Sequence, residues 1–200
     1  MSGSARGGLA PCRLIVLAGL PGTGKSELAR ELSRRIDSVW LRVDTIEASM
    51  LKAGVPRSFE TGLAAYLVAR DLGRDHLQLG RDVVVDAVNG VEAARRMWRE
   101  LAEECASDRY VIEVTCSDAR EHRRRVESRD PPTPPLPPPT WEEILNREYE
   151  DWREPTLRVD GMLPPAQNVS QIIRYVGGSE TESWSRPRSR KSRSRQSSLT

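Results

Sequence analysis

The segment that most constrains this chain is residues 19–26, whose sequence GLPGTGKS follows the spacing G-x-x-x-x-G-K-S. It comes directly after residues 13–18, RLIVLA, a short apolar run of the kind typical of a strand buried on both faces. It leads into residues 24–36, where leucine, alanine and isoleucine recur at helical spacing between charged residues. The sequence therefore predicts a glycine-rich turn that joins a buried strand to an amphipathic helix.

This turn has the composition of a phosphate-binding loop. Small residues let backbone N–H groups curl around phosphate oxygens, and the positive end of the following helix adds to that field. Lys25 would neutralise the β- and γ-phosphates of a nucleotide, and the Ser26 hydroxyl would bind Mg²⁺. A glycine-rich turn with a chance lysine is the alternative, but every fixed position of the spacing is filled. We expect nucleotide contacts from Gly19, Leu20, Pro21, Gly22, Thr23, Gly24, Lys25, Ser26 and Glu27.

Short apolar strands alternate with helical patterns along most of the remaining chain. Further strands are predicted at 39–43, 83–85, 110–115 and 156–160. Helices are predicted at 45–53, 61–79 with a bend near Gly73, 91–106, 117–129, 141–152 with a Thr140–Glu143 cap, and 169–175. This alternation indicates βαβ units and a three-layer α/β fold with a five-stranded parallel sheet.

Charge is distributed unevenly along the 200 residues. The net charge is +2, yet residues 186–200 carry six bases and no acid, so the preceding 185 residues hold 25 bases and 29 acids, about −4. We predict a flexible N-terminus over 1–11, one domain over 12–178 and a disordered Arg/Ser tail over 179–200. Because clustered basic charge supplies most non-specific affinity for nucleic acid, only the tail qualifies for that partner.

The apolar runs are too short for a membrane span. The longest, Leu14–Leu20, is far below the roughly 20 residues that a span requires. The first thirteen residues lack the pattern of a secretory signal, and the three cysteines lack metal-ligand spacing. We therefore expect a cytoplasmic protein that makes no membrane contact.

Two acids follow predicted strands. Asp86 comes after three valines, at the end of a strand where ligands of open α/β sheets bind. There it would hold Mg²⁺ through water or accept a substrate proton, the alternative being a strand-end acid that caps the next turn. Asp44 would act as the general base for an acceptor hydroxyl or as the N-cap of the next helix. Which acid is the base stays open.

The segment 117–140 combines an arginine-rich helix with a proline-rich loop and is lid-like. Its arginines are Arg120, Arg123, Arg124, Arg125 and Arg129. Arg120 and Arg124 share one helical face, and we assign them to stabilising the charge that develops during phosphoryl transfer. A solvated charged face is the alternative for each single arginine.

Other polar residues are weaker candidates. Asn89, Arg95 and Arg96 follow the Asp86 strand and would line an acceptor pocket, although helix arginines are usually ordinary surface residues. His76 and His122 have no partner at metal-ligand spacing, so we interpret both as structural or surface residues.

Taken together, these motifs resemble the small P-loop kinases of the nucleoside-kinase-like class, related to the AAA-domain zeta-toxin, chloramphenicol phosphotransferase and polynucleotide kinase group. The matching segments are GLPGTGKS at 19–26, LRVD at 41–44, VVVDAVN at 83–89 and EVTCSDAREHRRRVESR at 113–129. The resemblance implies the strand order 2-3-1-4-5. It also implies that Asp44 serves the acceptor, and that the arginine-rich segment closes over ATP.

The resulting hypothesis is an ATP-dependent kinase that transfers the γ-phosphoryl group to a hydroxyl of a small-molecule acceptor. Lys25, Asp44, Asp86, Arg120 and Arg124 are its expected catalytic residues, with Mg²⁺ held by Ser26 and Asp86. Two alternatives stay open. One is an enzyme that phosphorylates 5′-hydroxyl polynucleotides with help from the basic tail, and the other is a nucleotide-binding regulatory or scaffold ATPase.

Overall fold

The computed structural model describes residues 11–128 and 139–177. These residues form a parallel five-stranded sheet in the order β2-β3-β1-β4-β5. The strands are β1 (Arg13–Ala18), β2 (Val39–Arg42), β3 (Val83–Asp86), β4 (Asp108–Thr115) and β5 (Leu157–Asp160). The predicted α/β fold class and the strand order implied by the family resemblance are both confirmed.

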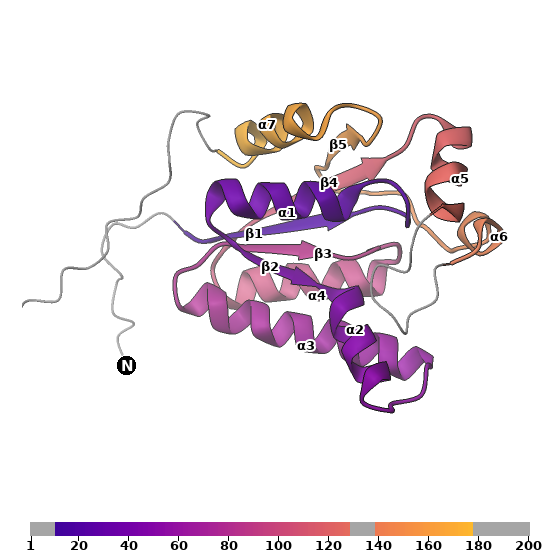
Figure 1. Ribbon diagram of the computed structural model, residues 1–200. Helices are drawn as coiled ribbons and strands as arrows, with labels where there is room; N and C mark the ends of the chain where they lie inside the picture. Colours follow the sequence, from indigo (N-terminus) through magenta and orange to yellow (C-terminus); the bar gives the residue numbers. More distant parts are fainter. Residues whose placement is uncertain (1–10, 129–138, 178–200) are drawn as a thin grey trace, which may run out of the picture.

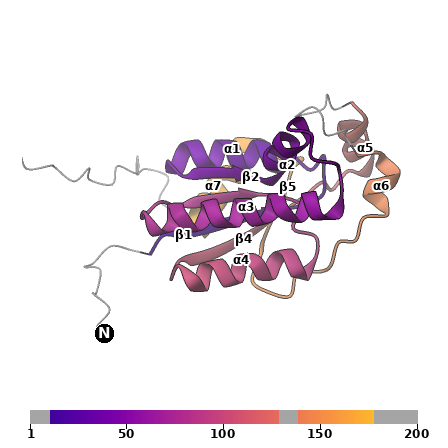
Figure 2. The same cartoon turned by 90° about the horizontal axis from the view of Figure 1, so that it is seen from below.

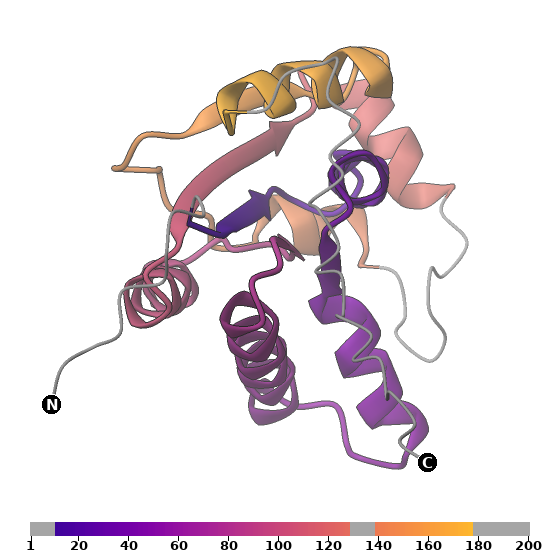
Figure 3. The ribbon, with the colours of Figure 1, turned by 90° about the vertical axis from the view of Figure 1, so that its left-hand side faces the viewer.

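Helices cover both faces of the sheet. They are α1 (Lys25–Ile36), α2 (Val43–Lys52), α3 (Phe59–Gln78), α4 (Glu92–Glu104), α5 (Ala119–Glu127), α6 (Trp141–Leu145) and α7 (Pro165–Tyr175). Helices α1 and α7 lie on one face, and α3 and α4 on the other (Figures 1 and 3). Helices α2, α5 and α6 gather at the end of the sheet to which the strands point (Figures 1 and 2). The phosphate-loop segment and Asp86, the last residue of β3, therefore share this end.

The two cores follow from the alternation of side chains along each strand. In β1, Ile15 and Leu17 pack into the cluster with α1 and α7, while Leu14 and Val16 pack with Trp98 on the opposite side. All six residues of β1 are buried, as a strand covered by helices on both faces must be. Each large apolar side chain buried in this way contributes about 1.5–3 kcal/mol.

Several predicted boundaries are wrong. The strand predicted at 39–43 ends at Arg42, so Asp44 lies in the first turn of α2 rather than at a strand end. Helix α3 is continuous through Gly73, so the bend predicted there does not interrupt the helix. A Cβ at Gly73 would lie 3.3 Å from Leu101 Cδ2, so this glycine permits close packing between α3 and α4.

The predicted helix 141–152 is also wrong, because α6 ends at Leu145. Its start matches the prediction, since Thr140 and Glu143 form a capping box. Its end is set by tertiary contacts: the Glu150 N–H donates to the Gly90 carbonyl at 2.8 Å. The Trp152 ring lies 3.9 Å from the Arg95 guanidinium carbon. These contacts hold the segment in an irregular path.

Some predictions concern residues outside the described ranges. They include the basic tail, most of the proline-rich loop and Arg129. Within residues 11–128 and 139–177, no helix is long and apolar enough to cross a membrane. Cys12, Cys105 and Cys116 are free thiols.

Candidate active site

The GLPGTGKS segment joins β1 to α1, and its glycines hold it close to neighbouring elements. Gly19, Gly22 and Gly24 have φ angles of 144°, 87° and 93°, which side-chain-bearing residues rarely adopt. A Cβ at Gly19 would lie 2.3 Å from the Val114 carbonyl oxygen, and one at Gly22 would lie 2.6 Å from Val126 Cγ2. The loop therefore packs against β4 and α5 with no room for side chains at these two positions.

A cavity of about 230 Å³ opens at the N-terminus of α1. Its lining residues are Gly22, Gly24, Lys25, Ser26, Glu27 and Arg125. Two cationic side chains and the positive end of a helix converge here, which suits an anion such as a phosphate chain. Arg125 donates to the Gly161 carbonyl at 3.0 Å, and this bond holds its guanidinium beside the loop.

The arginines of α5 are distributed differently from the prediction. Arg125 lines the loop cavity, whereas Arg120 is exposed and Arg124 points to solvent with a 67% exposed side chain. Arg124 instead donates two hydrogen bonds to Glu121, of 2.6 and 2.7 Å. Hydrogen bonds from Arg124 and Arg125 lower the pKa of Glu121 to about 2. The described structure does not bring Arg120 or Arg124 to this cavity.

His122 connects the loop to the lid-like segment. Its Nε2 lies 2.8 Å from the Pro21 carbonyl oxygen, and its ring meets Trp141 edge-on at a centroid distance of 5.2 Å. His122 is thus a buried link between the phosphate-loop segment, α5 and α6. In the sequence, we interpret this histidine from metal-ligand spacing. That spacing carries no information about such a contact.

Asp86 lies at the centre of a buried charged group. It is 2% exposed, and its carboxylate oxygens lie 3.9 Å from Lys25 Nζ and 3.9 Å from Arg42 Nε. Asp86 Oδ2 and two Arg42 nitrogens have no hydrogen-bond partner within the described residues. Buried polar atoms left unsatisfied cost about 1–3 kcal/mol each, so this group is suited to receive a polar ligand.

The same residues fit a magnesium ion. Asp86 contributes a carboxylate oxygen that has no hydrogen-bond partner among the described residues, and Ser26 contributes a hydroxyl in the lining of the loop cavity. Mg²⁺ prefers such oxygen ligands, usually one or two from the protein together with phosphate and water. Among the described residues there is no group of three or more His, Cys, Asp and Glu side chains that would make an all-protein site.

Asp44 lies near Asp86 but in different surroundings. Its side chain is 39% exposed, and its Oδ2 lies 4.0 Å from Arg42 Nη2. Arg42 therefore lies between the two acids. Helix α2 begins at Val43 with Arg42 as its N-cap, so the alternative role of Asp44 as N-cap is wrong.

A second cavity, of about 490 Å³, lies between α3, α4 and the loop after β3. Its lining includes Val88, whose carbonyl accepts the Gly19 N–H at 3.1 Å. A single hydrogen bond thus joins the wall of this cavity to the phosphate-loop segment. Asn89, Arg95 and Arg96 are not among its lining residues, although Gly90 is.

Comparison with known proteins assigns the family. A family model described as "AAA domain" matches residues 14–147. The chain belongs to this AAA-domain family. A guanylate kinase from Thermobifida fusca is 30% identical over 145 residues, which cover 72% of this chain and 70% of that protein. The AAA-domain chain is therefore a member of a kinase-like P-loop group.

Solved structures share the fold of the AAA-domain chain. The Mycobacterium tuberculosis APS kinase, in complex with AMPPNP and APS, superposes with a TM-score of 0.66 at 18% identity, over 85% of this chain and 100% of that one. A sugar kinase from Janibacter superposes with a TM-score of 0.64 at 15% identity, over 84% and 95%. At these identities the likeness concerns the fold.

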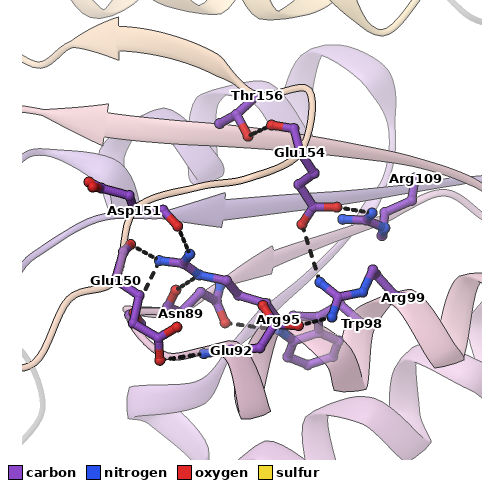
Figure 4. Close-up of polar contacts among 11 residues, drawn as sticks. Asn89, Glu92, Arg95, Trp98, Arg99, Arg109, Glu150, Asp151, Glu154 and Thr156 are labelled. Carbon is purple, nitrogen blue, oxygen red and sulfur yellow. Dashed lines mark hydrogen bonds and ion pairs between the residues drawn. The ribbon is translucent and has the colours of Figure 1, made fainter.

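In the AAA-domain chain, Asn89 and Arg95 form a buried hydrogen-bonded network (Figure 4). The Asn89 side chain donates to the Leu17 carbonyl at 2.9 Å and accepts the Trp98 indole N–H at 2.8 Å. Arg95 donates to the carbonyls of Asn89, Gly90, Glu150 and Asp151. Arg96, by contrast, is exposed and lies 3.6 Å from Glu100. The network ties the loop after β3 to the segment after α6.

Proposed function

We propose that this protein is an ATP-dependent kinase that transfers the γ-phosphoryl group to a hydroxyl of a small molecule. The observation that carries the proposal is the unsatisfied Asp86 carboxylate beside Lys25, at a phosphate-type loop next to a second cavity. Membership of a kinase-like family supports the reaction class. A single domain over 12–178 would carry the activity.

In this proposal residues 19–27 hold the triphosphate of ATP. Backbone N–H groups and Lys25 contact the phosphates, and Arg125 replaces Arg120 and Arg124 as the α5 arginine that stabilises charge on the transferred group. Ser26 and Asp86 would hold Mg²⁺. A magnesium ion held there would offset the negative charge of the phosphates.

The second cavity would hold the acceptor. Its hydroxyl oxygen attacks the γ-phosphorus, the bond from that phosphorus to the β–γ bridging oxygen breaks, and the hydroxyl proton passes to the Asp44 carboxylate. ADP is released with the phosphorylated product. Asp44 suits the proton better than Asp86 because it is partly exposed and its charge acts on Glu47 in the cavity wall.

The test combines nucleotide binding with turnover. Wild-type protein is expected to bind mant-ATP and to release ADP when given pooled hydroxyl-bearing metabolites, while Lys25→Ala does neither. Asp44→Asn should retain mant-ATP affinity and lose at least 100-fold in turnover, the range of about 10²–10⁴ that a general base supplies. In Asp86→Asn, mant-ATP binding should no longer depend on Mg²⁺. Wild-type protein without binding or turnover would refute the proposal.

The same assay distinguishes the alternatives. ADP release with 5′-hydroxyl oligonucleotides alone would indicate a polynucleotide kinase. Mant-ATP binding without turnover, together with unchanged cellular activity of Asp44→Asn, would indicate a regulatory or scaffold ATPase. The tail on which the first alternative depends lies outside the described residues.

A further inference from the structure

The cavity between α3 and α4 is mainly apolar. Most of its wall consists of aliphatic and aromatic side chains from α3, α4 and the loop between β3 and α4, including Phe59, Leu63, Val88, Val91, Ala94 and Met97. Polar groups are confined to Glu47, Ser58, Tyr66, Arg147 and Glu148. A ligand of such a cavity buries carbon surface and meets few hydrogen-bonding groups.

The charge of the cavity disfavours anions. Two of its lining residues are acids and one is a base, and Asp44 lies close enough to act on Glu47. Burial, followed by the charge of Asp44, raises the pKa of Glu47 despite the opposing effect of Arg57 and Arg147. The ionised form of a carboxyl group in this wall is therefore already disfavoured. A ligand that carries a phosphate dianion would be disfavoured more strongly.

Tyr66 offers one hydrogen bond that suits a hydroxyl. Its oxygen accepts the Asn89 backbone N–H at 3.3 Å, and its ring packs against Trp98 at a centroid distance of 6.2 Å. Among the described residues no group accepts a hydrogen bond from its own O–H, so this O–H is free to donate to a ligand oxygen. Burial raises the pKa of Tyr66 to about 12, which keeps the phenol protonated at neutral pH.

We propose that the acceptor is a hydroxyl compound with an apolar body and without phosphate or carboxylate groups. The inference rests on the proposed kinase function and names its substrate class. The apolar body packs against α3 and α4, and the hydroxyl lies at the inner end near Tyr66 and Val88, where the cavity meets the phosphate-loop segment. A guanylate acceptor, the substrate class in the name of the Thermobifida relative, would bring a phosphate dianion into this acidic, apolar wall.

A matched set of probes tests the substrate class. The set contains 2-phenylethanol, phenylalaninol, 3-phenyllactate and GMP, used beside pooled hydroxyl compounds sorted by charge. We expect ADP release with uncharged or cationic apolar alcohols, at least tenfold higher in kcat/KM than with carboxylate counterparts, and none with GMP. The proposal is overturned if the acceptors found carry phosphate or carboxylate, or if mant-ATP binds but no uncharged or cationic alcohol is phosphorylated.

Ligand binding without ATP separates this inference from the kinase proposal. Saturation-transfer NMR of 2-phenylethanol should show binding to the wild-type protein and none to Ala94→Phe, in which the new ring fills the cavity. Arg96→Phe is the matched control, because it adds the same ring to an exposed position of α4. An equal signal in all three proteins would refute binding in the cavity. Failure of mant-ATP binding with the expected NMR pattern would refute the kinase alone.

A separate variant tests whether the charge of the cavity wall selects against anionic acceptors. Glu47→Gln removes one acid from the wall and retains its shape, so the preference for 2-phenylethanol over 3-phenyllactate should fall at least threefold. An unchanged preference would show that the wall charge does not exclude anions.

Discussion

Replacing Arg95 should reveal how strongly the core depends on one arginine. Arg95 is 3% exposed and donates to four backbone carbonyls, two in the loop after β3 and two after α6. The Trp152 ring stacks on the same guanidinium. Arg95→Ala removes all these contacts and leaves buried carbonyls without their partner. Arg95→Met removes the donors while keeping most of the side-chain volume.

The expected loss in the free energy of unfolding follows from these contacts. A hydrogen bond to a charged group contributes about 1.5–3 kcal/mol and the stacked ring about 0.5–2 kcal/mol, but interactions that share one side chain do not add. A buried carbonyl left without its donor costs about 1–3 kcal/mol, and because these losses do not simply add we expect about 3 kcal/mol or more for Arg95→Ala and Arg95→Met alike. Arg95→Lys retains the charge but lacks the planar fork, so a loss of about 2 kcal/mol is expected.

Urea unfolding followed by circular dichroism measures this loss, and amide hydrogen exchange at Gly90 and Glu150 shows whether it is local. The control is Arg99→Ala, one turn further along α4. Arg99 pairs with Glu92 and Glu154 in partly exposed ion pairs, which contribute about 0–1 kcal/mol. A loss below 1 kcal/mol for Arg95→Met, or one no larger than that of Arg99→Ala, would refute the reasoning.

Two further predictions concern the loop and the second cavity. Gly22→Ala is expected to weaken mant-ATP binding roughly tenfold, because φ is 87° at this position and the new Cβ would meet Val126. Adding Val126→Ala should restore only the part of the affinity that is lost to this contact. Unchanged binding by Gly22→Ala would contradict the expected backbone strain. The raised pKa of Glu47 means that the folded state binds its proton more tightly than the unfolded chain, so this residue lowers stability as pH rises above 4.5. Urea unfolding should show Glu47→Gln more stable than wild type at neutral pH but not below pH 4.5, and a pH-independent difference would contradict this reasoning.

The sheet could be predicted because its central strands are buried on both faces. Continuous apolar runs such as 13–18 and 83–85 have few other structures available between glycines and polar turns. The end of β2 could not be predicted in the same way, since Val43 is apolar and buried whether it ends a strand or begins a helix. The end of α6 depends on Arg95, about fifty residues away, and no local pattern contains that contact.

The choice between α5 arginines shows which signal in the sequence was informative. Spacing of four residues shows that Arg120 and Arg124 share a face, but it does not show which face meets the phosphate-loop segment. The large apolar residue Val126 does: it is buried together with His122, and at 100° per residue Arg120 and Arg124 lie on the opposite side of α5. Arg123 and Arg125 flank the buried face.

Sequence alone does not separate those two. Arg123 pairs with Glu127 at 2.7 Å on the surface, while Arg125 is drawn to the Gly161 carbonyl beside the loop. A Cβ at Gly161 would lie 1.9 Å from the Thr23 carbonyl oxygen, so the segment after β5 lies directly against the phosphate-loop segment. The close approach of two glycine-containing segments far apart in the sequence thus decides which arginine faces the candidate phosphate cavity.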